Sequence, residues 1–240
     1  MKSIVSKEYW DKHWQGANFD IVVKHHPVRK WIEKNVISVK NNKCLEVGCY
    51  PGKFLAVFGE KGYELNGIDL FDGTESLLPN WLKKKGYKVG SFYKSDFLNF
   101  KNDNLYDLVC SFGFIEHFKD WQTVLRKHIE LTKKGGKIMV GVPNLKSPLY
   151  YFLYWLLESN VLDNHELEAM DFKEIVNFLE KEGCEIKSAE YLGYFYFRFV
   201  TRNDKISKLI SCLINLLRPA FRLLPMNIRA RYIGIVAIKK

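Results

Sequence analysis

The sequence has 240 residues, of which 47% are hydrophobic, and this suits one globular domain with a sizeable core. The formal net charge of +10 raises nucleic acid as a partner, but the basic residues are spread among 27 acids, so nucleic acid is not the expected substrate. The five cysteines have no metal-ligand spacing, which favours reduced thiols in a cytoplasmic protein. No run reaches about 18 apolar residues, which excludes a predicted membrane span.

The first 40 residues are expected to form helices in front of the first strand. Tyr9, Trp10 and Trp14 place aromatic rings on one helical face, and packing onto the core explains this face as well as ligand contact does. Residues 44–47 then read as a short buried strand, and the run 53–61 reads as an amphipathic helix. Between them lies a turn that contains Gly48, Pro51 and Gly52.

This strand, glycine turn and helix predict a site for a nucleoside. A sharp turn into a helix brings backbone N–H groups against a ligand, and glycine lacks the Cβ that would block the approach. Asp69 follows Gly52 by 17 residues and closes the next predicted strand. A carboxylate at that place can accept hydrogen bonds from both hydroxyls of a ribose.

Two other nucleotide-binding patterns fit this turn less well. The dinucleotide pattern G-x-G-x-x-G needs three glycines, but Tyr50 occupies the middle position. Glu46 would repel a pyrophosphate and would suit a cationic aminoacyl group. A Walker loop needs Ser or Thr after Gly-Lys, whereas Phe54 follows here. An ordinary strand–turn–helix with an incidental pair of glycines is the remaining alternative.

The segment 43–54 resembles the first motif, E-x-G-x-G-x-G, of the class I S-adenosylmethionine-dependent methyltransferases. Three later segments are similar to further motifs of that family, in the same order. They are 94–97 after a strand predicted at 88–91, 106–118 with its Tyr-Asp start and Glu-His end, and 131–144 with its Gly-Gly pair. The resemblance covers about residues 35–200, with a last strand at 231–238. It implies an α/β fold with a doubly wound, mostly parallel seven-stranded sheet, Rossmann-like, with helices on both faces.

The resemblance implies S-adenosylmethionine as cofactor and S-adenosylhomocysteine as product. The implied cofactor-binding residues are Glu46, Gly48, Tyr50, Gly52, Asp69, Leu70, Asp96, Phe97 and Ser111. Asp96 would accept from the adenine amino group, and Phe97 would lie against the ring. Tyr50 departs from the family pattern, because its bulk narrows the space near the methionine moiety unless the ring turns outward. This departure keeps open a non-catalytic partner subunit that binds the cofactor.

The resemblance also places the residues after the fourth strand beside the methyl group, which makes Glu116 and His117 catalytic candidates. A histidine with a pKa of ~6.5 is a competent base at neutral pH, so we predict that His117 deprotonates an acceptor hydroxyl. Glu116 would orient it or bind the acceptor, and a structural role for the pair is the alternative. His165 is the second candidate base, with Asn144 as a polar neighbour. No metal is predicted, because the sulfonium already activates the methyl group.

Two segments extend the minimal fold, and substrate choice is expected to lie there. The aromatic segment 146–170 leaves the carboxyl edge of the sheet and is predicted to form a lid, with an ordinary buried helix as the alternative. The segment 203–230 interleaves basic and apolar residues, which predicts an amphipathic helix broken at Pro219 and Pro225. Such a helix can contact an anionic membrane surface, here the inner membrane face, or pack on the domain.

We therefore predict a single methyltransferase domain over residues 1–240, with cap helices in 1–40, the lid 146–170 and the basic insertion 203–230. The predicted reaction is O-methylation of a small molecule, specifically a sugar of a surface-glycan precursor on a lipid or nucleotide carrier, as in polysaccharide biosynthesis. The alternative acceptor is a quinone-type or phenolic, lipid-soluble ring.

Overall fold

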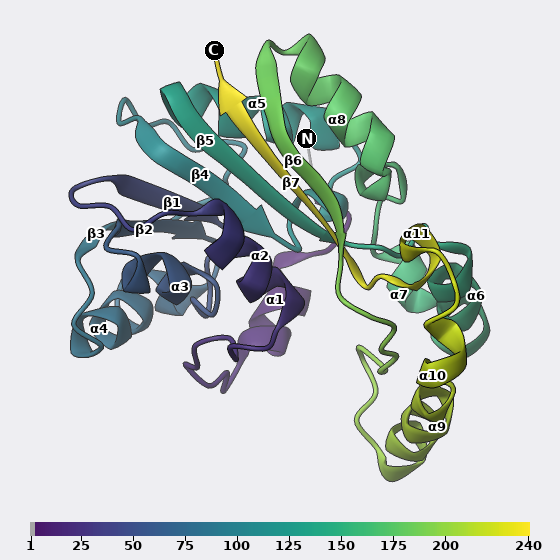
Figure 1. Ribbon diagram of the computed structural model, residues 1–240. Helices are drawn as coiled ribbons and strands as arrows, with labels where there is room; N and C mark the ends of the chain where they lie inside the picture. Colours follow the sequence, from purple (N-terminus) through teal and green to yellow (C-terminus); the bar gives the residue numbers. More distant parts are fainter. Residues whose placement is uncertain (1–2) are drawn as a thin grey trace.

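The predicted alternation of strands and helices forms one seven-stranded sheet in the computed structural model, which describes residues 3–240 (Figure 1). The strands are β1 (Lys43–Val47), β2 (Glu64–Asp69), β3 (Val89–Lys94), β4 (Tyr106–Phe112), β5 (Thr132–Pro143), β6 (Cys184–Leu192) and β7 (Tyr232–Lys239). Their order is β3-β2-β1-β4-β5-β7-β6, and only β7 runs antiparallel to its neighbours. The predicted fold class is confirmed.

The position of each strand in the sheet explains its composition. β1 lies in the middle with both faces covered, so four of its five residues are buried and it reads as an apolar run. β3 lies at the edge and is only partly buried, so its pattern is weak. The sequence placed this strand at 88–91, but its pairing with β2 continues to Lys94 opposite Asp69. The extra residues bring the end of β3 level with the end of β2.

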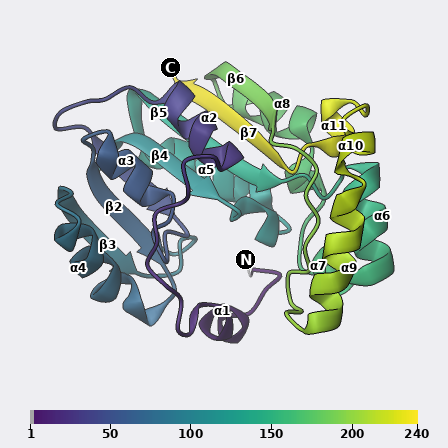
Figure 2. The ribbon, with the colours of Figure 1, turned by 60° about the horizontal axis from the view of Figure 1, so that its bottom comes forward.

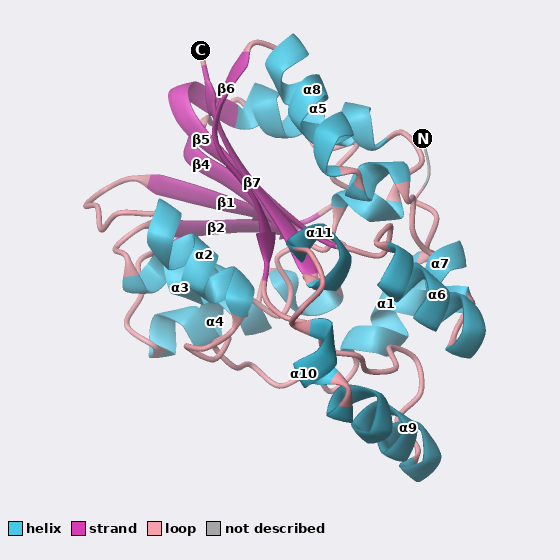
Figure 3. Cartoon of the chain, turned by 45° about the vertical axis from the view of Figure 1, so that its right-hand side comes forward, coloured by secondary structure: helices cyan, strands magenta, loops and turns pink. Residues whose placement is uncertain are grey.

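Helices cover both faces of the sheet (Figures 1 and 3). The helices are α1 (Lys7–Trp14), α2 (Pro27–Asn35), α3 (Leu55–Glu60), α4 (Leu77–Lys84), α5 (Trp121–Leu131), α6 (Pro148–Leu157), α7 (Asn160–Asp163), α8 (Phe172–Lys181), α9 (Lys205–Leu216), α10 (Arg218–Phe221) and α11 (Met226–Arg229). Side chains of α2, α3 and α4 share one hydrophobic core, and those of α5 and α8 share the other. The chain is thus wound around the sheet on both sides, as predicted.

A buried arginine connects α2 to α3, the helix that follows the glycine turn. The guanidinium of Arg29 donates to the carboxylates of Glu33 and Glu60, at 2.8 and 2.6 Å, and to the carbonyl of Val22 at 2.8 Å. Arg29 is buried while both glutamates are partly exposed, so every charge is paired or reaches water. This contact holds α2 against α3 and so fixes the turn that α3 follows.

The segments predicted to extend the minimal fold form helices at one end of the molecule (Figure 2). Residues 146–170 contain α6 and α7, and residues 203–230 contain α9, α10 and α11. The helix is interrupted near both prolines at which the sequence predicted a break: α9 ends at Leu216 and Pro219 lies in the first turn of α10, while Pro225 directly precedes α11. Among residues 3–240 no helix has the length and apolar character that crossing a bilayer requires. The predicted cap segment 1–40 begins outside the described residues and contains α1 and α2.

Candidate active site

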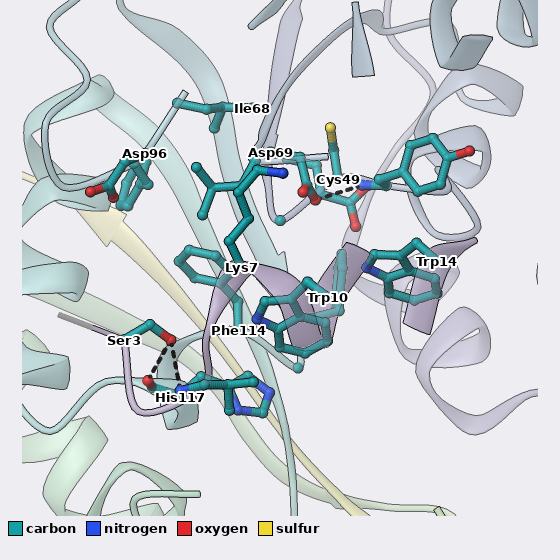
Figure 4. Close-up of a pocket in the computed structure, with 18 of the residues that line it drawn as sticks. Ser3, Lys7, Trp10, Trp14, Cys49, Ile68, Asp69, Asp96, Phe114 and His117 are labelled. Atoms are coloured by element: carbon teal, nitrogen blue, oxygen red, sulfur yellow. Dashed lines mark hydrogen bonds between the residues drawn. The ribbon is translucent and has the colours of Figure 1, made fainter. Parts of the chain in front are cut away.

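The carboxyl ends of β1, β2 and β4 open onto a cavity of about 470 Å³ (Figure 4). Its wall includes the turn after β1, the residues that follow β2 and β3, the loop after β4, and α1. Nine of the predicted site residues line it: Glu46, Gly48, Tyr50, Gly52, Asp69, Leu70, Asp96, Phe97 and His117. Their individual roles stay predictions, but the fold brings them to one place.

The turn after β1 depends on two glycines in the left-handed region. Gly48 has φ +70° and Gly52 has φ +85°, conformations that other residues rarely adopt. A Cβ on Gly48 would lie 2.6 Å from the Phe114 ring, and one on Gly52 would lie 2.4 Å from Leu78 Cδ1. Both positions therefore exclude a side chain for steric as well as conformational reasons.

Asp69 closes β2 and holds two loops at the edge of the cavity. Its Oδ2 accepts from the backbone N–H of Tyr50, and its Oδ1 accepts from that of Phe71, both at 3.0 Å. Burial raises the pKa of the Asp69 carboxyl, and these backbone donors oppose the rise. Since each carboxylate oxygen has a second lone pair, both oxygens can also accept from a ligand.

Tyr50 does not disrupt the turn, because its ring packs into a cluster of aromatic side chains. The ring centroid lies 4.3 Å from that of Phe71, 5.5 Å from Phe19 and 6.3 Å from Trp14. Only 5% of the tyrosine is exposed. The backbone N–H that a glycine would supply at this position is still present and is directed at Asp69.

Glu46 supplies an unsatisfied carboxyl group in the cavity wall. The residue is buried, and its Oε2 has no hydrogen-bond partner among the described residues. Burial, reinforced by the neighbouring Asp69, raises the pKa of this carboxyl well above its usual value. An orphaned buried carboxyl group is costly unless a ligand satisfies it. A cationic amino group, such as that of S-adenosylmethionine, fits this position.

Helix α1 forms the side of the cavity that faces Asp69 and Asp96 (Figure 4). Trp10 and Trp14 line the cavity, and the Trp10 ring meets the His117 ring edge-on at 4.9 Å. The backbone N–H of Ile4 donates to the carbonyl of His117 at 2.8 Å, which attaches the segment before α1 to the loop after β4. The sequence predicted an aromatic face on this helix but left open whether the rings contact the core or a ligand. In the structure, two of these rings, Trp10 and Trp14, line the cavity.

His117 lies at the cavity wall as a neutral imidazole. Its Nδ1 is 3.0 Å from the carbonyl oxygen of Asn164, an acceptor, so Nδ1 carries the proton and Nε2 keeps a free lone pair. Burial lowers the pKa of His117 to about 3, with a further contribution from His165. This pKa lies well below the ordinary value of ~6.5 from which the sequence argument started, because desolvation disfavours the imidazolium. His117 is nevertheless a proton acceptor at every physiological pH.

Glu116 and His165 lie beside His117 but outside the cavity wall. Burial raises the pKa of Glu116 to about 8, so its carboxyl is largely protonated at neutral pH. His165 Nδ1 bonds with the carbonyl of Val161, and its ring centroid is 4.6 Å from that of His117. One ligand atom from each of the three residues lies within 4.8 Å of the others, a set that can hold a metal ion. The sequence named these three residues as catalytic candidates but predicted no metal.

Two predicted positions differ from expectation. Ser111 is buried inside β4, its hydroxyl has no partner among the described residues, and it does not line the cavity. β4 continues to Phe112, so Phe112, Gly113 and Phe114 form the wall in its place. Asn144 donates to the carbonyls of Asn227 and Ala230, at 3.0 and 2.9 Å, and so braces the loop before β7. It does not join His165.

Comparisons with known proteins agree with this geometry. A family model described as a methyltransferase domain matches residues 23–193, well over half of the chain. A ubiquinone biosynthesis O-methyltransferase from Stutzerimonas stutzeri is 23% identical over 152 residues, 62% of this chain and 63% of that protein. The chain thus spans less than two thirds of that relative. A protein of the same name from Rickettsia bellii is 23% identical over 203 residues, 79% of this chain and 82% of its own.

The fold is also similar to that of solved structures. The magnesium protoporphyrin IX methyltransferase from Synechocystis PCC 6803, solved with bound SAH, superposes with a TM-score of 0.57. The superposition covers 98% of this chain and 88% of that protein, at 12% sequence identity. At this identity the likeness shows the fold.

Proposed function

This chain belongs to the S-adenosylmethionine-dependent methyltransferase family, and from that premise we propose that its acceptor is the hydroxyl of a phenolic, lipid-soluble ring. The relatives named above carry out O-methylation in ubiquinone biosynthesis, and this supports the acceptor that the sequence offered as its alternative. The relatives named above do not support the sugar acceptor with its place in polysaccharide biosynthesis, which stays a prediction.

The observation that carries the proposal is the chemistry of the wall around His117. Trp10, Phe114 and Phe118 give this wall a large aromatic surface, and its polar side chains are His117, Ser3, Ser6 and Lys7, of which Ser3 is occupied by a hydrogen bond to the His117 carbonyl. A sugar needs several hydrogen-bonding side chains, whereas a flat apolar ring needs aromatic surface and one polar contact. This wall fits the flat ring.

A phenolic hydroxyl is also the easier of the two acceptors to deprotonate. With any base, removing a proton from a phenol, with a pKa of ~10, costs less free energy than removing one from the less acidic hydroxyl of a sugar. We assign to His117 Nε2 the role of accepting that proton while the hydroxyl oxygen attacks. Glu116, neutral at this pH, adds no charge that would repel the developing phenolate.

The cofactor assignments follow from the cavity wall. Glu46 would bind the amino group, Asp69 the ribose hydroxyls, and Asp96 with Phe97 the adenine. S-adenosylmethionine supplies a methyl group that its sulfonium already activates. The residues of the chain therefore have to hold the acceptor oxygen in line with that methyl group and keep water out.

A methyl-transfer assay with a catechol ring and with free sugars tests the acceptor, comparing wild type, His117→Ala and His25→Ala. We expect transfer to the catechol only, a loss of ~100-fold in kcat for His117→Ala, and no change for the exposed His25→Ala. Transfer to a sugar alone would reject the phenolic acceptor. Binding of S-adenosylhomocysteine without turnover on any hydroxyl would support the non-catalytic alternative instead.

We also infer that α9 places the protein against an anionic membrane surface, from which a lipid-soluble acceptor can enter. Ile206, Leu209 and Leu216 of this helix are each 60% or more exposed. The segment 203–230 also carries five basic residues and one acid, so charge and apolar surface occur together. Vesicle binding, described below, tests this contact.

A further inference from the structure

A second cavity, of about 730 Å³, lies between α9 and the segment that follows β6. Four basic side chains line it, namely Arg198, Arg202, Lys208 and Arg218. No acidic residue among those that the structure describes lines it. Tyr196 and the polar residues Asn203, Ser207, Ser211 and Asn215 complete its polar lining. None of these residues lines the methyl-transfer cavity.

In the segment after β6, which forms one wall of the cavity, buried and exposed side chains alternate. Phe195, Phe197 and Phe199 are buried in the core, so the residues between them, including Tyr196 and Arg198, face outward. Asn215 of α9 accepts from the N–H of Phe197 at 3.0 Å and donates to its carbonyl at 2.7 Å. This double contact holds α9 at a fixed distance from the segment and keeps the cavity open.

The cations of this cavity have few partners within the protein. Arg218 stacks on the Tyr196 ring at 4.5 Å and donates from Nε to Asn215 at 3.2 Å, which orients its guanidinium. Arg202 Nε lies 3.8 Å from Asp204 Oδ2, an ion pair. The side chains of Arg198 and Lys208 make no ion pair or hydrogen bond with residues 3–240. Of the four cations only Arg202 has an acidic partner within the described part of the chain, and since like charges repel, this excess of positive charge points to an external anion.

We propose that this cavity binds a phosphate or diphosphate group. Guanidinium forks and an ammonium around a polar cavity are the donors that phosphate oxygens accept from, and Arg218 is already held in place. The group can belong to a free diphosphate or to a lipid headgroup. Leu216, at the cavity, and Leu209 and Leu213, which precede it on α9, are exposed and give the headgroup's acyl chains an apolar surface.

The test uses the double variant Arg198→Glu/Lys208→Glu in the full chain. The matched control is Lys24→Glu/Lys40→Glu, which makes the same charge change on exposed residues that lie outside segment 203–230 and do not line the cavity. Calorimetric titration with inorganic pyrophosphate measures the free group. Flotation with phosphatidylcholine vesicles, with and without phosphatidylglycerol, measures the headgroup. Thermal denaturation establishes that both variants are folded.

We expect wild type and control to bind one of the two probes, and the cavity variant to bind it at least about tenfold more weakly, or ~1.4 kcal/mol. Binding of pyrophosphate identifies a free ligand, and binding of phosphatidylglycerol vesicles alone identifies a headgroup. If both variants lost affinity for the probe equally, the effect would come from net charge and the proposed site would be wrong. The site would also be wrong if wild type bound neither probe. Neither result depends on turnover, so the proposed methyl transfer is judged separately.

Discussion

Replacing Asp69 with alanine tests the cofactor assignment most directly, because this carboxylate has two separable tasks. It accepts two backbone hydrogen bonds of 3.0 Å, from Tyr50 and Phe71, and we assign to it the ribose hydroxyls. A hydrogen bond to a charged group contributes about 1.5–3 kcal/mol, and burial of the carboxylate places these bonds at the lower end. The loss of both backbone bonds should therefore lower the free energy of unfolding by about 3 kcal/mol.

The Asp69→Ala change should also weaken binding of the cofactor. Two ribose hydroxyls that donate to the carboxylate contribute about 3 kcal/mol, so Asp69→Ala should weaken S-adenosylhomocysteine binding roughly 100-fold. Asp69→Asn keeps one acceptor oxygen and should weaken it less, by about tenfold. Its amide group must face one backbone N–H, so we expect part of the stability loss to remain.

Calorimetric titration with S-adenosylhomocysteine measures the affinity, and urea denaturation without ligand measures the stability. Asp103→Ala is the control, because it removes the same charge from an exposed position. If Asp69→Ala binds S-adenosylhomocysteine within about threefold of wild type, the ribose assignment is wrong. If its stability is unchanged, the two backbone bonds do not carry the free energy assigned to them.

Three further variants probe the site and its support. Gly48→Ala should weaken S-adenosylhomocysteine binding at least about tenfold in a calorimetric titration, because its Cβ meets Phe114, while Gly86→Ala, also left-handed but in open space, should not. Burial lowers the pKa of His128 from 6.5 to about 4, so the unfolded chain takes up its proton first as pH falls. The neutral buried imidazole therefore contributes about 3 kcal/mol to the free energy of unfolding, a contribution that is complete above pH ~6.5 and is lost as the pH falls toward 4. When the free energy of unfolding in urea is measured as a function of pH, His128→Phe should remove this decrease. Arg29→Met should lower the free energy of unfolding by about 2 kcal/mol in the same assay, because it removes the hydrogen bonds to Glu33 and Glu60 although both carboxylates still reach water, whereas Lys30→Met should cost less than about 0.5 kcal/mol.

The grouping of the predicted cofactor-binding residues around one cavity could be predicted from the sequence because its signals are local. Gly48, Gly52 and Asp69 belong to a strand, a turn and the next strand, and parallel strands bring their carboxyl ends to one edge. Ser111 was misplaced because the end of β4 depends on its pairing with β5, which continues through Phe112 opposite Gly141. The end of a strand is a property of the sheet and is poorly marked in the strand's own residues.

The acceptor end could not be predicted to the same depth. The tautomer of His117 depends on the carbonyl of Asn164, 47 residues further along the chain, and its pKa depends on burial under Trp10 and beside His165. The phosphate cavity likewise requires α9 to be held by Asn215 against the segment after β6. No spacing in the sequence encodes such distant contacts.

The insertion of β7 between β5 and β6 has a consequence for synthesis on the ribosome. β6 pairs only with β7 in this sheet, and β7 begins 40 residues after β6 ends. While the chain emerges from its N-terminus, β5 presents an open edge and β6 has no ladder to join. A nascent chain is therefore exposed to strand-mediated aggregation until residues 232–239 have left the exit tunnel, so translational pausing or chaperone capture should have its strongest effect on yield in this interval.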